Sequence, residues 1–229
     1  MNRRRLLGAA ALLGVIGASS AANARNDAPT EWDGLKRVKS KKIEYVYLAP
    51  DADFRPYTKV ALDPTEIAFR KNWKRDYNDT KMGLSGRVQD SDINKVITEG
   101  GKAATALFAD AFTQGGYPVV ATAGPDVLRI RTAVVNISVS APDIAVPGRS
   151  RTYAQEAGSA SLIVEVRDSM TGALLGRAVD HRLAGDTGAW YRNSVTNKAD
   201  FRQVVKTWAK NAVVGLNTLK ATPPGGGGA

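Results

Sequence analysis

The chain has a single histidine, His181, and no cysteine. A serine hydrolase of this sequence would therefore have to use His181 as its general base. Around Ser85 the sequence is GLSGR, which lacks the second glycine of the G-x-S-x-G nucleophile elbow. His181 lies between Asp180 and Arg182 in a segment that predicts a strand, so we interpret it as a hydrogen-bonded or half-exposed strand histidine.

The sequence also lacks complete motifs for metal, phosphate and calcium binding. One histidine and no cysteine exclude disulfides, iron–sulfur clusters and multi-histidine metal sites. The glycine pair before Lys102 is not a phosphate-binding loop, because position 96 is valine where that loop begins with glycine. The D-x-D pairs at residues 51–53 and 90–92 lack the longer ligand series and closing glutamate of a calcium loop. We therefore predict no cofactor, no metal and no catalytic residue.

Composition is ordinary for a globular protein. Of 229 residues, 43% are hydrophobic, 24% charged and 7% aromatic, which excludes a collagen-like, coiled-coil or wholly disordered chain. The formal net charge is +10. The sequence indicates a fold class and a location for the protein, but it singles out no reaction.

The first 24 residues have the pattern of a cleavable signal peptide. Arg3, Arg4 and Arg5 precede an apolar stretch over residues 6–17, and Ala22-Asn23-Ala24 places small residues before the cleavage point. A membrane-spanning helix is the alternative, but it needs about 20 apolar residues. The sequence predicts export by the Sec or twin-arginine route to the periplasm, with no lipid anchor, because the chain has no cysteine.

The rest of the chain predicts one domain over residues 42–220. A basic polar segment, residues 25–41, precedes the domain, and a glycine-rich tail, residues 221–229, follows it and is expected to be disordered. Pro64 places one strand at a sheet edge or gives it a bulge. A change of apolar phase between Ala133 and Val135 predicts a second bulge. The expected strands cover residues 43–48, 58–70, 118–122, 127–139, 159–168 and 173–183, the last two as a hairpin.

Two stretches have apolar side chains at helical spacing, residues 91–113 and 198–220. Asp90 or Ser91 is expected to cap the first helix and Asn197 the second. Glycines 100 and 101 within the first helix predict close backbone packing or a kink, and residues 72–87 are expected to be irregular. One apolar face per helix predicts an α+β, two-layer sandwich, in which two amphipathic helices cover a mostly antiparallel mixed sheet.

A cluster of basic residues lies just before the first expected strand: Lys36, Arg37, Lys39, Lys41 and Lys42. It is a candidate contact for anionic lipid headgroups or anionic envelope polymers. The alternative is a solvated basic strand edge that prevents sheet-to-sheet aggregation. Nucleic acid is not expected as a partner, because export separates the protein from it.

Trp190 and Tyr191 form the second candidate surface. They lie in a glycine-containing segment, GDTGAWY, that is expected to form a loop after the hairpin. Paired aromatic rings on a loop can stack on a sugar ring or pack on a partner protein. The alternative is that both rings fold back and close the core.

Residues 47–64 resemble a bacterial family of unknown function. The sequence YLAPDADF at 47–54 has the pattern Y-x-A-P-x-A-D-F, and it is followed by Tyr57 and by the apolar run VALDP at 60–64. The family consists of exported envelope proteins, many of them lipid-anchored. The resemblance would cover about residues 42–220, implies an envelope location and assigns no catalytic residue. The missing lipid-attachment cysteine is a departure from many members.

These observations predict a non-enzymatic periplasmic module that binds an envelope protein or glycan. Two alternatives remain open at this stage. One is a hydrolase of cell-wall glycan or peptide that uses carboxylates, for which a carboxylate with a strongly raised pKa in a cleft would be the sign. The other is a structural subunit of an envelope complex that pairs an open sheet edge with a partner strand.

Overall fold

The computed structural model describes residues 28–81, 86–140, 152–154, 157–185, 190–192 and 194–222. Within these residues the chain forms an eight-stranded sheet, a separate pair of strands and three helices. The strands are β1 (Glu31–Trp32), β2 (Leu35–Val38), β3 (Tyr45–Leu48), β4 (Lys59–Leu62), β5 (Glu66–Phe69), β6 (Val127–Val139), β7 (Thr152–Ala154), β8 (Gly158–Asp168), β9 (Leu174–Ala184) and β10 (Trp190–Arg192). The helices are α1 (Trp73–Asp79), α2 (Asp90–Gln114) and α3 (Ser194–Ala221).

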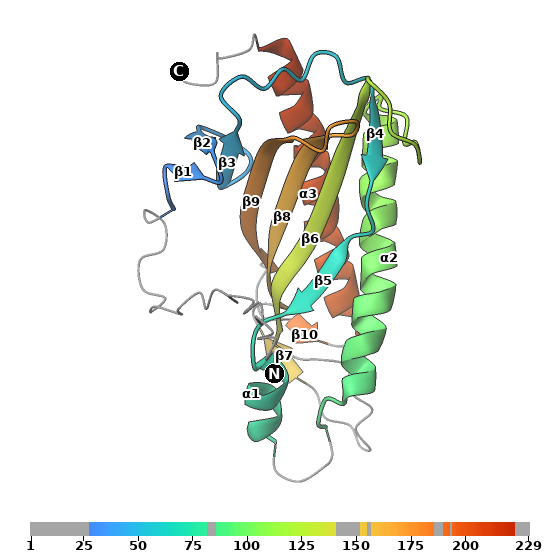
Figure 1. The fold of residues 1–229 in the computed structure, drawn as a ribbon. Coiled ribbons are helices and arrows are strands. Elements are labelled where there is room, and N and C mark those ends of the chain that lie inside the picture. The colour runs from blue at the N-terminus through green and yellow to red at the C-terminus, as the bar shows by residue number, and fades with distance from the viewer. Residues whose placement is uncertain are drawn as a thin grey trace, which may run out of the picture.

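The sheet has the order β1-β2-β3-β9-β8-β6-β4, and β5 continues the edge by pairing with β6. β4 and β5 run parallel to β6, and the other neighbours are antiparallel. Helices α2 and α3 lie together behind the sheet, as Figure 1 shows. This arrangement confirms the predicted α+β fold with two layers. We call the opposite side of the sheet its front face.

The predicted hairpin is confirmed as β8 and β9, and its residues 169–172 make the turn. In the long strand β6, buried Leu128, Ile130 and Val134 follow one phase and Ile137 follows the other. The expected bulge exists, but it lies at Asn136, whose φ is +53°, rather than between residues 133 and 135. Asparagine tolerates positive φ better than the β-branched residues around it, which explains the site of the extra residue.

Pro64 divides the predicted strand 58–70 into β4 and β5, and both halves lie at the sheet edge as expected. Residues 118–122, expected to be a strand, make only an isolated bridge between Val119 and Val60. Residues 73–79, expected to be irregular, form α1, whose Trp73 is buried and stacks on Phe69. Trp73 also donates through Nε1 to the Val139 carbonyl of β6 at 3.3 Å, a long-range contact that local polarity could not indicate.

Both long helices begin earlier than predicted. Gln89, not Asp90 or Ser91, occupies the N-cap of α2, and its N–H donates to Asp92 Oδ2 at 2.8 Å. α3 begins at Ser194, so Asn197 lies inside the helix and is buried rather than acting as a cap.

Close packing at Gly101 is confirmed. A Cβ at that position would lie 2.9 Å from the Thr65 backbone oxygen, so only glycine lets α2 approach the edge of the sheet there. The core between sheet and helices includes Val60, Phe108, Phe112, Leu128, Ile130, Leu162 and Trp208.

The predicted basic segment, residues 25–41, contributes two strands to the sheet. β1 pairs with β2, and β2 pairs with β3. The predicted signal peptide, residues 1–24, and residues 223–229 of the predicted tail lie outside the described residues.

Candidate functional site

The two helices behind the sheet are too narrow to cover it completely. The sheet is seven strands wide, which at a spacing of about 4.8 Å is about 29 Å. Two helices of about 10–12 Å diameter cover about 20–24 Å. α2 packs against β4 and β5, and α3 packs against β9. The back of β2 and β3 is therefore left beside α3 as the least covered part of the sheet.

An apolar groove of about 480 Å³ lies between α3 and the back of the sheet, where its lining extends from β2 and β3 across β9 and β8 to β6, and we call it the α3 groove. Val46 and Leu48 of β3 and Ala178 of β9 line its strand wall. Val214, which is 40% exposed, and Gly215 belong to its helix wall. No aspartate or glutamate is among its lining residues. Its further apolar lining includes Phe112, Leu128, Ile130, Val164, Val166, Leu216 and Leu219.

All five residues of the predicted basic cluster are exposed, and they divide into two groups. Lys36 and Arg37 lie on β2, where neighbouring residues point to opposite faces of the sheet. Lys39, Lys41 and Lys42 lie in the connection from β2 to β3 and line the α3 groove. We call these three residues the lysine rim. The structure thus places three of the five predicted residues at an apolar groove, which sequence reasoning did not anticipate.

Hydrogen bonds hold the lysine rim in place. Ser40 Oγ accepts from the backbone N–H groups of Lys42, at 3.4 Å, and Ile43, at 3.2 Å. The Lys42 carbonyl accepts from Asn211 Nδ2 of α3 at 3.1 Å and from Arg182 Nη2 of β9 at 3.3 Å. The connection is therefore attached to both walls of the groove through its backbone, which leaves the lysine ammonium groups at the surface.

A buried carboxylate, Asp180, joins the same elements below this connection. Its oxygens accept from the Glu44 backbone N–H at 2.9 Å, from Trp208 Nε1 at 2.8 Å and from Arg182 Nε at 2.7 Å. Asp180 thus ties β9 to α3 and to the segment before β3. Its hydrogen bonds to protein groups indicate a structural role.

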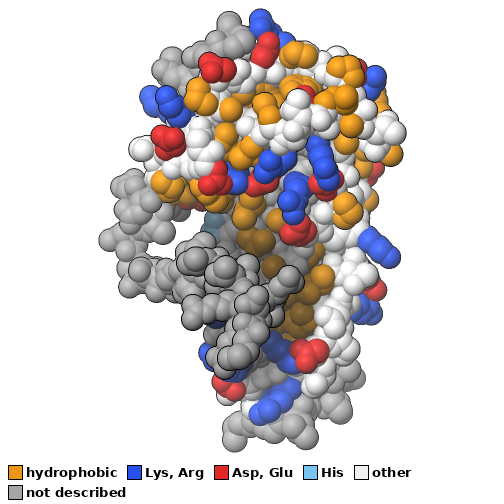
Figure 2. All heavy atoms as spheres, in the orientation of Figure 1, with side chains coloured by type: hydrophobic (Ala, Val, Ile, Leu, Met, Phe, Trp, Pro, Cys, Tyr) orange, Lys and Arg blue, Asp and Glu red, His pale blue; other side chains and the backbone are white. Residues whose placement is uncertain are grey.

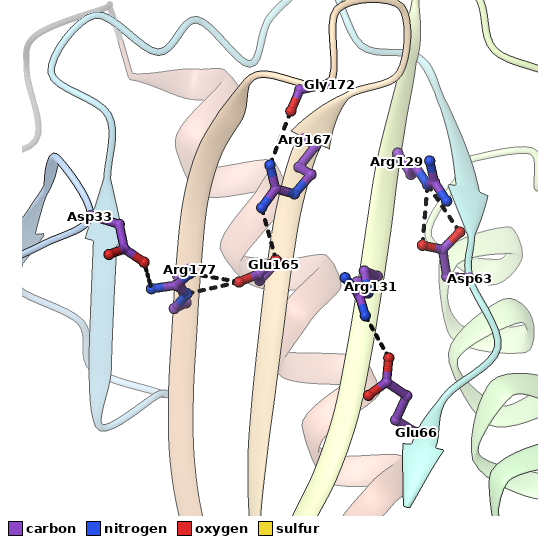
Figure 3. Close-up of polar contacts among 9 residues, drawn as sticks. All are labelled: Asp33, Asp63, Glu66, Arg129, Arg131, Glu165, Arg167, Gly172 and Arg177. Carbon is purple, nitrogen blue, oxygen red and sulfur yellow. Dashed lines mark hydrogen bonds and ion pairs between the residues drawn. The ribbon is translucent and has the colours of Figure 1, made fainter. Parts of the chain in front are cut away.

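The front face of the sheet carries alternating charges (Figures 2 and 3). Arg177 of β9 is the most enclosed of them: its side chain is 8% exposed and lies over the Trp32 ring at 4.1 Å. Its guanidinium donates to Glu165 of β8 at 2.6 and 3.0 Å and to Asp33 at 2.8 Å. Arg167 donates to the same Glu165 at 3.2 Å.

These contacts shift both pKa values in the direction that favours the ion pair. Burial alone would raise the pKa of Glu165, but hydrogen bonds from Arg177 and Arg167 outweigh it, so the pKa is lowered. Burial alone would lower the pKa of Arg177, but hydrogen bonds to Asp33 and Glu165 outweigh it, so the pKa is raised. The group is fully charged at neutral pH and stabilises the pairing of β8 with β9.

Two further ion pairs extend the charged row to the edge strands. Arg129 Nε donates to Asp63 Oδ1 at 3.0 Å, and Arg131 Nη2 donates to Glu66 Oε1 at 2.6 Å, as Figure 3 shows. Sequence reasoning missed this row. The available signal was the spacing of two in R-x-R at 129–131 and E-x-R at 165–167, because residues two apart on a strand share a face.

Among the described residues, the carboxylates with a resolved pKa shift are all more acidic than usual. Two hydrogen bonds from Thr171 and one from the Tyr57 hydroxyl, at 2.8 Å, lower the pKa of Asp168. Arg55 lowers the pKa of Asp53 to about 2. The pKa of Asp126 is also lowered. Such groups stay ionised at neutral pH, whereas a catalytic general acid needs a raised pKa.

The residues that suggested the family resemblance lie in the folded domain. Phe54 is buried in the core and Tyr47 is buried next to Trp32. Burial, together with the hydrogen bond to Asp168, raises the pKa of Tyr57 to about 12. The aromatic residues of the family-like segment therefore pack in the domain or form hydrogen bonds within it.

His181 is exposed on β9, and its Nδ1 lies 3.2 Å from Ser161 Oγ on the paired strand β8. A catalytic triad also requires a third group that orients the imidazole, and the structure shows none among the described residues. Across the same ranges no three histidine, aspartate or glutamate side chains gather as a metal site. No helix in the described part of the chain is long and apolar enough to cross a membrane.

Trp190 and Tyr191 lie on strand β10, not in a loop as predicted. β10 pairs with β7, and the register places Trp190 opposite Ala154 and Tyr191 opposite Tyr153. The glycines near these aromatic residues suggested a loop. They form a strand because they pair with β7, whose residues come 36 to 40 positions earlier in the chain. The contacts of the two aromatic side chains lie outside what the structure describes.

Residues 24–212 match the family described as "Protein of unknown function (DUF3313)". No protein with a curated description matches the chain.

Several solved structures are similar to the chain at low sequence identity and low TM-score. A dodecamer of a PelC variant from Paraburkholderia phytofirmans is 13% identical over 75% of this chain and 95% of its own, with a TM-score of 0.38. A DUF330-family protein from Xanthomonas campestris is 13% identical over 75% and 90%, with a TM-score of 0.34. A DUF4136-family protein from Bacteroides thetaiotaomicron VPI-5482 is 12% identical over 82% and 98%, with a TM-score of 0.34. TM-scores this low carry no argument about what the chain does.

Proposed function

The chain belongs to the DUF3313 family of proteins of unknown function, and from that premise we propose that it is a non-enzymatic binding or accessory module of the bacterial cell envelope. In this proposal residues 1–24 are a signal peptide that is removed on export, and the remaining chain acts in the periplasm without a lipid anchor. Trp190 and Tyr191 are proposed as a contact for an envelope protein or glycan.

The observation that carries the proposal is the exposed basic cluster at residues 36–42. Within the described residues no ion pair includes a side chain of the cluster, although Lys36 lies opposite Glu31 on the paired strand β1. Each basic residue near an anionic membrane surface contributes about 1 kcal/mol of binding free energy. Because Lys36 and Arg37 point to opposite faces of the sheet, at most four of the five charges face one surface, and four are sufficient for reversible adsorption to an anionic surface of the envelope.

The two alternatives have less support. A carboxylate hydrolase would need an acid with a raised pKa, and each carboxylate shift resolved in the described residues is downward. A structural subunit would need a long open sheet edge for a partner strand. The edge strands β1, β4 and β5 have two, four and four residues, which offers few unpaired backbone groups.

Vesicle co-sedimentation tests the proposal. The exported protein should adsorb to vesicles that contain phosphatidylglycerol but not to pure phosphatidylcholine, and high salt should release it. Replacing the five cluster residues with glutamine should weaken adsorption at least 100-fold. The matched control replaces five exposed basic residues on the helices with glutamine and should retain adsorption: Lys95, Lys102, Arg202, Lys206 and Lys210. Equal losses in both variants, or no adsorption by the wild type, would contradict the role of the cluster.

A further inference from the structure

We propose that the α3 groove binds a fatty-acid anion, with the acyl chain along the apolar walls and the carboxylate among Lys39, Lys41 and Lys42. The inference deepens the proposed function, since it gives part of the same basic cluster a ligand. It rests on the geometry of the groove as well as on charge.

The walls of the groove favour an apolar chain. The volume of about 480 Å³ lies within the range of small-molecule sites, about 300–1,000 Å³. Val214 on the helix wall is 40% exposed, so part of the lining is in contact with water when the groove is empty. Covering that surface with an alkyl chain is favourable, and each buried methylene strengthens binding about fourfold.

The charges at the mouth select the head group. Lys39, Lys41 and Lys42 are exposed and line the groove, and no acidic side chain lines it. Arg177 is also part of the lining, but its guanidinium is bound to Glu165 and Asp33 on the front face. The net field at the mouth is therefore positive, which favours an anionic head group over a cationic one of the same chain length.

The backbone at the mouth is fixed before any ligand arrives. The Lys42 carbonyl accepts hydrogen bonds from the side chains of Asn211 and Arg182. The Ser40 hydroxyl accepts a hydrogen bond from the backbone N–H of Ile43, which orders the turn that carries the lysines. A ligand therefore has to order only the lysine side chains, which reduces the entropic cost of binding.

Gly215 offers a variant that fills the groove without harming the fold. It lines the groove within α3, and a Cβ at this position would meet no atom within 4 Å. Leucine and alanine both have higher helix propensity than glycine, so Gly215→Leu and Gly215→Ala should unfold at the same or a higher temperature. The leucine side chain should occupy the space that the acyl chain needs, and alanine should occupy only part of it. Gly100→Ala on α2 is the matched control. A Cβ at this position would lie 4.0 Å from side-chain atoms of Ile67 and Val96, which is an ordinary van der Waals distance.

Isothermal titration of the purified exported protein with sodium dodecanoate, below its micelle concentration, tests the inference. We expect saturable binding of one dodecanoate per chain, with octanoate and dodecyltrimethylammonium each at least tenfold weaker. Gly215→Leu should weaken dodecanoate at least tenfold, Gly215→Ala less, and Gly100→Ala not at all. The triple glutamine variant of the lysine rim should reduce the preference for dodecanoate over dodecyltrimethylammonium.

Three outcomes would overturn the inference. They are no saturable binding of dodecanoate, unchanged binding by Gly215→Leu, and equal binding of the anionic and cationic probes. The vesicle experiment keeps the two proposals separate, because Gly215→Leu should still adsorb to phosphatidylglycerol. Vesicle adsorption without dodecanoate binding would refute the groove site alone, and dodecanoate binding without adsorption would refute the surface contact alone.

Discussion

Replacing Arg177 with methionine should lower the free energy of unfolding by about 3 kcal/mol. The side chains of Arg177 and Glu165 are 8% and 19% exposed, so the substitution leaves a carboxylate that is largely shielded from water. Breaking a buried ion pair from one side costs about 3–5 kcal/mol. The lower end applies, because Arg167 still donates to Glu165 at 3.2 Å and because Asp33, at 59% exposure, is solvated.

Urea unfolding followed by tryptophan fluorescence measures the effect. For a domain of this size a loss of about 3 kcal/mol corresponds to a fall in Tm of roughly 6–12 °C. Arg131→Met is the matched control: Arg131 and its partner Glu66 are 54% and 62% exposed, and exposed ion pairs contribute little to stability. The control should unfold with the wild type.

A double variant separates the lost ion pair from lost packing. When Glu165→Leu is added to Arg177→Met, no shielded carboxylate remains, so the two substitutions together should cost less than the sum of the two single changes. Wild-type stability in Arg177→Met would refute the reasoning. Strict additivity in the double variant would show that the two charges do not interact.

Two other predictions concern pH and the aromatic strand. The pKa values of Glu165 and Asp168 are lowered in the folded protein, so the unfolded chain binds protons first as the pH falls. Stability should therefore be lost below about pH 4. Glu165→Gln should flatten this loss in urea unfolding between pH 5 and 2, and an unchanged slope would contradict the assignment. Replacing Trp190 and Tyr191 with alanine should abolish in-cell crosslinking to an envelope partner without changing Tm, whereas an unchanged crosslinked set would exclude this surface.

Features that depend on local periodicity were predictable. The apolar stripe at residues 91–113 predicted α2 closely, and the run at 159–183 predicted the hairpin of β8 and β9 with its turn. Pro64 correctly indicated an edge strand, because its missing N–H cannot serve a central ladder. In each case the residues that decide the structure are neighbours in the chain.

Features that depend on distant partners were not predictable. Trp190 and Tyr191 form a strand because residues 152–154 pair with them. Lys36 and Arg37 lie on a strand because β2 pairs with β3, although their own sequence is a run of charges. Residues 73–79 form a helix whose Trp73 donates through Nε1 to the Val139 carbonyl of β6 at 3.3 Å. Glycines pointed to a loop around Trp190 and Tyr191, and polarity pointed to irregular structure at residues 72–87, but strand pairing and packing overrode both.

The sequence by itself determined the fold class, the predicted export signal and the presence of five basic residues within a run of seven. Only the tertiary structure decided that three of those charges border an apolar groove, and that the alternating charges of β6, β8 and β9 pair across strands. The reason is geometric. The groove is lined by residues of five strands and two helices that are far apart in the sequence, and its width depends on where α3 packs, which no local pattern of residues specifies.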